Sequence, residues 1–193
     1  MNEGLFSAVT VRRLEAADRP VILTWLKDPV VRAAVQDEDV RTDRPSDTLA
    51  LFEECDPFRK GDLCLLAEKE GQPFALIRFS WINWVNRNAE VMIFIGPRDR
   101  RRSLAAIQAV EKIGDVAFNS LNLHKVYAFI YGSNGDSLGV FGRIMKTEAR
   151  LKGYLKTETG YEDFLVLGLL ADDYRRLMDR ARRRPASTVE ASR

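Results

Sequence analysis

The chain has 193 residues, 46% of them hydrophobic, and a formal net charge of +2 from 30 Lys and Arg against 28 Asp and Glu. This length suits one domain, and the composition excludes intrinsic disorder, which needs low hydrophobicity and high net charge. The near balance of charge does not favour a nucleic-acid binder. No apolar run approaches the roughly 20 residues of a membrane-spanning helix.

Few residues are available for metal or triad chemistry. The chain has one histidine, His124, and two cysteines, Cys55 and Cys64. A zinc site needs several His or Cys ligands, and a catalytic triad could use only His124, so we expect no metal and no hydrolase. Residues 1–9 lack the basic and apolar regions of a signal peptide. We therefore expect a cytoplasmic protein with two reduced thiols rather than a disulfide.

The first third is predicted to hold a strand and several short helices. Residues 9–14 are rich in β-branched side chains, and residues 17–27 place apolar side chains at helical spacing. Asp28-Pro29 breaks this helix, because the residue before proline is pushed out of the helical region. Two further short helices are predicted at residues 30–35 and 47–55.

The middle is rich in strands. Strands are predicted at residues 63–67 and 74–81, joined by a turn at 70–73, and a third at residues 89–95. The strongest helix is residues 103–121, where apolar side chains recur at steps of three and four.

The last third continues with a strand at 125–131, a glycine-weakened helix at 134–145, strands at 149–155 and 161–169, and a helix at 172–184. This order indicates an α+β architecture, a mixed, mostly antiparallel sheet flanked by helices on both faces. We expect a domain at residues 1–178 and a basic, disordered tail at 179–193. We expect the tail to be solvated, with contact to nucleic acid or to an acidic partner as the alternative.

The turn between the strand at 89–95 and the main helix is strongly basic. Residues 96–103 read Gly-Pro-Arg-Asp-Arg-Arg-Arg-Ser. A helix N-terminus presents unpaired N–H groups and a partial positive charge, so with added arginines it can bind phosphate. The phosphate would belong to a nucleic acid or to a nucleotide cofactor, and a solvated basic turn remains the plain alternative.

Several segments in this order resemble the GNAT superfamily of acyl-CoA N-acyltransferases. They are Ala-Glu-Val-Met-Ile-Phe-Ile-Gly-Pro-Arg-Asp at 89–99, Ala-Phe-Asn-Ser-Leu-Asn-Leu-His-Lys-Val at 117–126, and Gly-Tyr-Glu-Asp-Phe-Leu-Val-Leu-Gly at 160–168. The resemblance covers about residues 9–170 and is closest to the branch of ribosomal-protein N-terminal and amino-sugar acetyltransferases. It implies a GNAT fold and attack of an amine on a CoA thioester.

The chain departs from the family pattern at two places. Ser103 stands where the family's pyrophosphate loop has a glycine that lets the backbone approach phosphate. Its Cβ crowds that approach, or its hydroxyl donates to phosphate. Phe141 stands at the usual tyrosine and cannot give a proton to the leaving thiolate.

The resemblance also assigns residues to roles. Glu90 is the candidate general base, with an outward strand charge as the alternative, and Ser137 is the candidate beside the leaving sulfur, with a helix cap as the alternative. His124 is expected to be structural. The cofactor residues are Ile93, Phe94, Ile95, Arg98, Arg100, Arg101, Arg102, Ser103, Ala105 and Asn134. Trp81, Trp84, Tyr161 and Asp163 are expected to border the acceptor, with packing as the alternative for the two tryptophans.

Two kinds of protein remain open. The first is an enzyme that transfers an acyl group, acetyl above all, from acetyl-CoA or another acyl-CoA to a primary amine. The acceptor would be a small metabolite, an amino sugar or a peptide N-terminus. The second is a non-catalytic GNAT-fold module that binds a ligand or partner. The departures favour the module, while the arginines, Glu90 and Asn134 favour the enzyme. We expect no membrane partner, do not favour nucleic acid, and allow for a homodimer.

Overall fold

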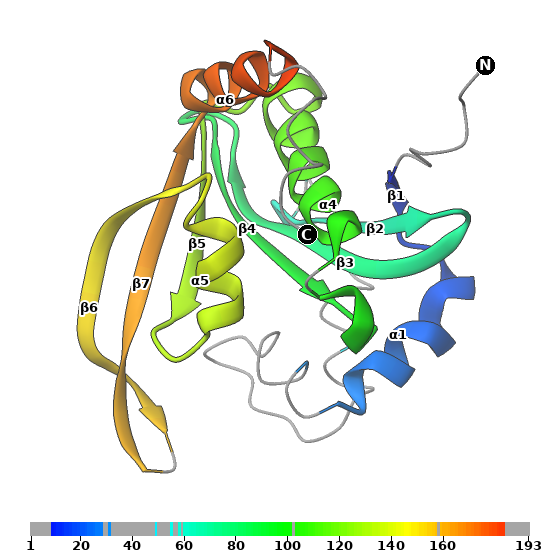
Figure 1. Cartoon of the computed structure of the whole chain (residues 1–193), viewed down its shortest axis with the longest axis horizontal. Coiled ribbons are helices and arrows are strands. Elements are labelled where there is room, and N and C mark those ends of the chain that lie inside the picture. Colours follow the sequence, from blue (N-terminus) through cyan, green and yellow to red (C-terminus); the bar gives the residue numbers. More distant parts are fainter. Residues whose placement is uncertain are drawn as a thin grey trace, which may run out of the picture. The chain divides into compact units, whose positions relative to one another are not determined.

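The protein is described from a computed structural model, which describes residues 9–28, 31, 49, 55, 58, 60–101, 103–157 and 159–183. The chain divides into two compact units, Met1–Leu123 and His124–Arg193. The first unit contains β1 (Thr10–Arg13), η1 (Ala16–Asp18), α1 (Arg19–Leu26), β2 (Leu63–Lys69), β3 (Gln72–Asn83), β4 (Asn88–Ile95), η2 (Arg98–Arg100), α4 (Leu104–Gly114) and the π-helical turn η3 (Asp115–Ser120). The second contains β5 (Lys125–Tyr131), α5 (Gly135–Phe141), β6 (Lys146–Thr157), β7 (Gly160–Leu170) and α6 (Ala171–Arg183) (Figure 1).

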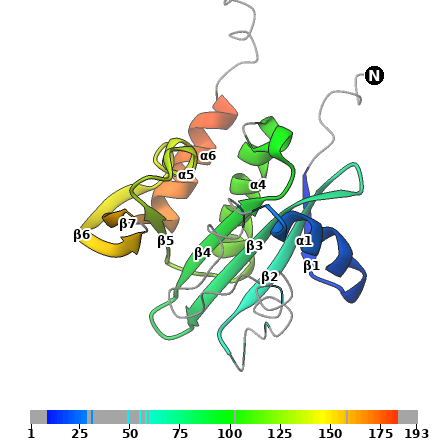
Figure 2. The same cartoon turned by 90° about the horizontal axis from the view of Figure 1, so that it is seen from below.

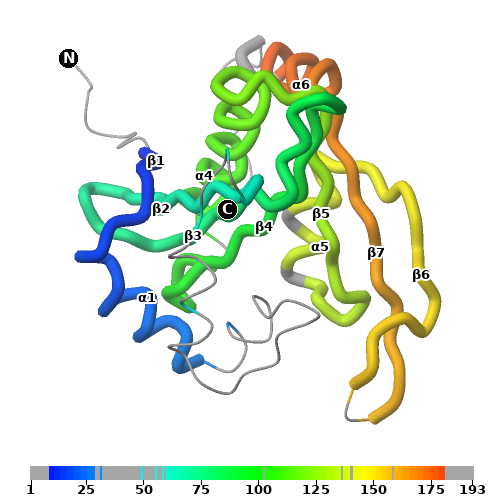
Figure 3. The backbone as a smooth tube through the Cα atoms, turned by 180° about the vertical axis from the view of Figure 1, so that it is seen from behind, coloured from blue at the N-terminus to red at the C-terminus, as the bar shows by residue number. Residues whose placement is uncertain are grey.

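The α+β class with a mostly antiparallel sheet is confirmed. In the first unit the strands pair in the order β1-β2-β3-β4, and every pairing is antiparallel (Figure 2). In the second unit β7 pairs antiparallel with both β5 and β6 (Figure 3). The predicted helices at 30–35 and 47–55 lie outside the described residues, apart from Val31, Leu49 and Cys55. None of the helices within the described ranges has both the length and the apolar character needed to cross a bilayer.

The first unit buries both faces of its strands. One face packs on α1, where Ile22, Trp25 and Leu26 join Leu66, Leu76 and Phe94 in one cluster. Side chains alternate between faces along a strand, so Ala75, Ile77 and Phe79, which are also fully buried, lie on the other face. The helix α4 contacts β3 and β1 and covers this second face with its alanines and Ile113.

A buried carboxylate fastens the first turns of this unit together. Arg12 of β1 donates two hydrogen bonds of 2.7 Å to Asp18, and the backbone N–H of Glu15 donates a third at 2.8 Å. Arg12 also bonds Glu68 of β2 at 2.9 Å. The Arg12 guanidinium holds the pKa of the Asp18 carboxyl below its usual range, because it stabilises the charged form.

The expectation of two reduced thiols is wrong in this structure. A disulfide joins Cys55 to Cys64, the second residue of β2, with the two Cα atoms 5.9 Å apart. This separation lies within the range that a disulfide spans. The sequence gives the number of cysteines, but whether the two lie close enough for a disulfide depends on the tertiary structure.

The second unit is built around an aromatic stack and one exposed strand. Phe164 of β7 is buried, stacks on Phe129 of β5 at 5.1 Å between ring centroids, and on Tyr154 of β6 at 5.7 Å. Elsewhere β6 is almost entirely exposed, with Leu155 its buried residue. The helix α6 runs to Arg183, and Ala171 and Tyr174 are its buried side chains within the described part. The domain limit at residue 178 stays a prediction.

Candidate functional site

The basic turn leads directly from β4 into α4. Ser103 is the N-cap of α4: its Oγ accepts the N–H of Ala106 at 3.4 Å and donates to the carbonyl of Arg100 at 2.7 Å. The predicted start of this helix at residue 103 is therefore confirmed within one residue. The hydroxyl already has two partners inside the turn, so its placement gives Ser103 a capping role in this structure.

The predicted phosphate arginines of the turn differ in their surroundings. Arg101 is 21% exposed in its side chain and donates to the carboxylate of Asp28 at 2.8 Å. Arg98 reaches the same carboxylate at 3.0 Å but is 75% exposed. Arg100 is 38% exposed and lies 4.0 Å from Asp99, at the outer limit for an ion pair. Arg102 lies outside the described residues.

A glycine closes the strand before this turn. A Cβ added to Gly96 would lie 2.1 Å from Cδ2 of the Trp25 indole, so only glycine fits against this ring. The N–H of Gly96 donates to the carbonyl of Phe74 on β3 at 2.9 Å. Trp25 is 7% exposed and meets Phe94 edge to face with centroids 6.1 Å apart. The indole therefore packs directly on the residue from which the turn starts.

The predicted strand residues follow a regular register. On β4, Ile93, Phe94 and Ile95 pair with Ile77, Leu76 and Ala75 of β3. Phe94 is buried in the α1-side cluster, while Ile93 and Ile95 are half-buried. Ala105 is buried in the first turn of α4.

Glu90 lies on the same strand as the predicted pantetheine contacts. It is half-buried and pairs with Ser80, a buried serine of β3. Since residues two apart share a face, Glu90 lies on the side of the sheet that also carries Phe94 and the α1 cluster. Arg78 pairs with Met92 one step along the same face. The register therefore places the Glu90 carboxylate beside Ser80 on the α1 side of the sheet.

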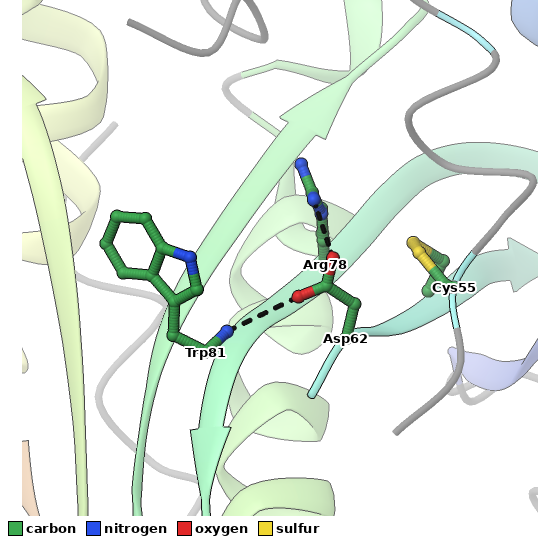
Figure 4. The surroundings of a disulfide bond; sticks show 5 residues. Cys55, Asp62, Arg78 and Trp81 are labelled. Carbon is green, nitrogen blue, oxygen red and sulfur yellow. Dashed lines mark hydrogen bonds and ion pairs between the residues drawn. A yellow bond between two sulfur atoms is a disulfide. The ribbon is translucent and has the colours of Figure 1, made fainter. Parts of the chain in front are cut away.

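Trp81 is held in an unusual conformation next to Ser80. Its φ of 51° lies in the left-handed region, which is a genuine outlier for a bulky side chain. Its backbone N–H donates to Asp62 at 3.3 Å, and Asp62 also binds Arg78 at 2.7 Å (Figure 4). The indole is left 61% exposed. Such strain tends to be kept at functional positions.

Trp84 lies in the turn between β3 and β4. It is 41% exposed and stacks on Phe58 with the ring centroids 5.8 Å apart. This contact supports the packing interpretation of Trp84.

In the second unit, Asn134 stands at the start of α5. Its Oδ1 accepts the N–H of Ser137 at 3.1 Å, and its carbonyl accepts the N–H of Leu138 at 3.0 Å. Asn134, rather than Ser137, therefore provides the cap of this short helix. His124 is exposed, and its carbonyl accepts the N–H of Ala171, which fits a structural role.

The two residues predicted from β7 have different surroundings. Asp163 accepts the N–H of Gly153 at 2.9 Å and is paired with Arg150. These bonds hold the pKa of Asp163 below its usual range and fasten the β6 bulge, where Gly153 has a φ of 56°. Tyr161 is 70% exposed and pairs with Lys156 across the hairpin.

The sequence pointed to the basic turn but missed the residues that bind Arg101 and the end of β3. Asp28 was interpreted only as the end of a helix, and Asp62 and Arg78 gave no local signal. Each acts through a partner far away in the chain, so no spacing rule could have found them. In the described part of the chain, no group of three or more His, Cys, Asp or Glu side chains could hold a metal ion.

Comparisons with known proteins give the family and the fold of the chain. The family model of the Acetyltransferase (GNAT) domain matches residues 8–144. A solved spermidine N-acetyltransferase from Vibrio cholerae, in complex with CoA and spermine, is 20% identical, covers 88% of this chain and 99% of its own, and has a TM-score of 0.74. A dodecameric structure of that enzyme in an intermediate state is 19% identical over 88% of this chain and 97% of its own, with a TM-score of 0.71. At these identities the likeness shows the fold. No curated protein matches the sequence significantly.

Proposed function

Because the chain belongs to the GNAT acetyltransferase family, whose reaction is acyl transfer from a CoA thioester to an amine, we propose that it acetylates a small primary amine with Glu90 as general base. The observation that carries the proposal is the family match across residues 8–144, which includes Glu90 and the whole basic turn. The half-buried position of Glu90 beside Ser80 supports the assignment.

Acetyl-CoA is the donor in this proposal. The N–H of Ala106 already donates to Ser103, while the N–H groups of Leu104 and Ala105 open the helix and lie at the positive end of its dipole. Together with Arg100, they are suited to the phosphates of CoA. The backbone of Ile93–Ile95 is assigned to the pantetheine arm, as the family resemblance implies.

The chemistry needs one proton to move before the bond forms. An ammonium group near pH 7 cannot attack, so Glu90 takes its proton directly or through one water. The amine nitrogen then attacks the thioester carbon, the C–N bond forms, the C–S bond breaks, and the second proton of the nitrogen passes to the departing thiolate or to water. Phe141 supplies no proton to the departing sulfur. The thiolate is still a tolerable leaving group, because a thiol has a pKa of about 8.5. Asn134 and Ser137 stay assigned to the donor side by the resemblance alone.

We assign the binding site of the acceptor amine to the exposed indole of Trp81. Trp81 follows Ser80, the register partner of Glu90, and is 61% exposed. A cationic amine can lie on a tryptophan face, where the ring attracts positive charge. Polyamines are the first acceptors to test, since the solved relative was crystallised with spermine. Peptide N-termini and amino sugars come next. A homo-oligomer and a cytoplasmic location belong to the same proposal.

The experiment measures CoA release from acetyl-CoA with a panel of amines, comparing the wild type with Glu90→Gln. Gln keeps the size of the side chain but cannot accept the proton, so turnover at neutral pH is expected to fall by about 10²–10⁴-fold. Higher pH should recover part of the loss, because more of the amine is then neutral. Glu70→Gln, in the exposed turn between β2 and β3, is the matched control.

Two results would contradict the proposal. Wild-type turnover in Glu90→Gln would make Glu90 a plain strand residue and direct the search for a base to Asp163 or Tyr161. Binding of CoA without acetylation of any amine in the panel would support the non-catalytic module instead.

A further inference from the structure

One guanidinium connects the end of β4 with the end of α1. Arg101 donates through Nη2 to Asp28 at 2.8 Å, and through Nε to the carbonyl of Ile95 at 3.2 Å. A third, longer bond from Nη2 reaches the carbonyl of Gly96 at 3.4 Å. Asp28 follows the last turn of α1. Its side chain is 14% exposed, so the ion pair is largely shielded from water.

We propose that Asp28 and Arg101 are positioning residues of the donor site: they fix the basic turn against α1 and leave phosphate contact to Arg100. The inference rests on the proposed function, because it assumes that the turn binds the phosphates of CoA. It changes the assignment of Arg101 from a ligand to a support.

The surroundings of the arginines carry this distinction. For Arg101 to turn toward a phosphate, it must leave a mostly buried carboxylate, and Arg98, which also binds this carboxylate, is 75% exposed. Leaving a buried charge without its main partner is unfavourable. Arg100 has no such tie among the described residues, since its acidic neighbour Asp99 is itself 81% exposed and 4.0 Å away. Arg100 can therefore move to a phosphate at little cost.

The packing around Gly96 makes the support effective. The indole of Trp25, one helical turn before Asp28, lies against Gly96, and β3 holds the N–H of Gly96. The end of β4 is therefore held by the Trp25 ring, by β3 and by the ion pair of Arg101 with Asp28. Loss of the ion pair is then expected to loosen the turn without displacing the strand.

The experiment compares Asp28→Asn, Arg101→Gln and the double variant. Each single variant should raise the KM for acetyl-CoA by about tenfold or more, the range expected for lost bonds to a charged group. The kcat and the KM for the amine should change little. The double variant should be no worse than either single variant, because residues that act through one another are not additive.

A donor without phosphates separates positioning from general damage. With acetyl-pantetheine, the variants should match the wild type in kcat/KM, because this donor has no phosphates for the turn to bind. This also shows that each variant is folded. Arg101→Lys, which can reach Asp28 but not both carbonyls, should lie between the wild type and Arg101→Gln. Arg87→Gln removes two guanidinium bonds of 2.7 Å to Asn122 at another turn and is the matched control.

Three results would overturn the inference: additive single variants, equal losses with acetyl-pantetheine, or an effect of Arg101→Gln that Asp28→Asn does not share. The last would make Arg101 a direct ligand. A failure of the proposed function would be recognised by another variant, Arg100→Gln. In that case Arg100→Gln would leave the preference for acetyl-CoA over acetyl-pantetheine unchanged, whatever the Asp28 variants do.

Discussion

Gly96→Ala tests the contact from which the basic turn starts. The added Cβ would lie 2.1, 2.3 and 2.4 Å from three atoms of the Trp25 indole. Carbon atoms pack at about 3.5–4.0 Å, so the ring or the strand must move by about 1 Å or more. The ring cannot rotate away easily, because Trp25 is 7% exposed and packed in the α1-side cluster.

Overpacking of a well-filled core typically costs about 1–3 kcal/mol. Because the contact involves a rigid ring and a backbone, we expect the upper part of this range. With an m-value of about 2 kcal/mol/M, the urea midpoint should fall by about 1–1.5 M. The assay is urea unfolding followed by circular dichroism.

Gly139→Ala is the control, since nothing lies within 4 Å of the Cβ it would gain. It lies in α5 and should be neutral or stabilising by up to about 1 kcal/mol. Trp25→Leu combined with Gly96→Ala should be little worse than Trp25→Leu alone, because the smaller side chain removes the clash. Equal midpoints for Gly96→Ala and the wild type would refute the reasoning.

Two further predictions concern the buried carboxylate and the helix cap. The Arg12 guanidinium depresses the folded-state pKa of Asp18, so its stabilisation is present above the unfolded pKa of about 3.9 and is lost as pH falls through the folded value. Asp18→Asn should therefore be less stable than the wild type at pH 7, and the gap in unfolding free energy should narrow below about pH 4; a constant gap would disprove the link. Ser103→Gly should cost only a few tenths of a kcal/mol in unfolding free energy and preserve or improve CoA affinity by calorimetry, while a sharp loss of affinity would make the hydroxyl a phosphate ligand.

The sequence predicted most of the regular elements because their apolar patterns are strong. The strand Lys125–Tyr131 was predicted with both of its ends, and the main helix, predicted to begin at residue 103, begins at Leu104 with Ser103 as its cap. The strand β6 was predicted three residues too short at its start and two at its end. Both of its faces are exposed, so it carries little of the alternation that marks a strand.

The site was less accessible to sequence reasoning than the fold. A basic turn before a helix is a local signal, and residues 96–103 could be found from it. The pairing of Asp28 with Arg101 joins residues 73 positions apart, and the disulfide depends on how residues before β2 return to it. Such contacts are set by tertiary structure, which a single sequence does not display.

The exposed strand β6 has a consequence for how the protein behaves at high concentration. It is the last strand of its sheet, and a long terminal strand can template pairing with another chain. Lys146, Arg150, Lys152 and Lys156 stand along it, two or four residues apart. A second β6 paired antiparallel, with Lys146 opposite Lys156 and Arg150 opposite Lys152, would bring like charges together, which disfavours this pairing. The cations that leave this strand without an apolar pattern thus work against self-pairing of β6.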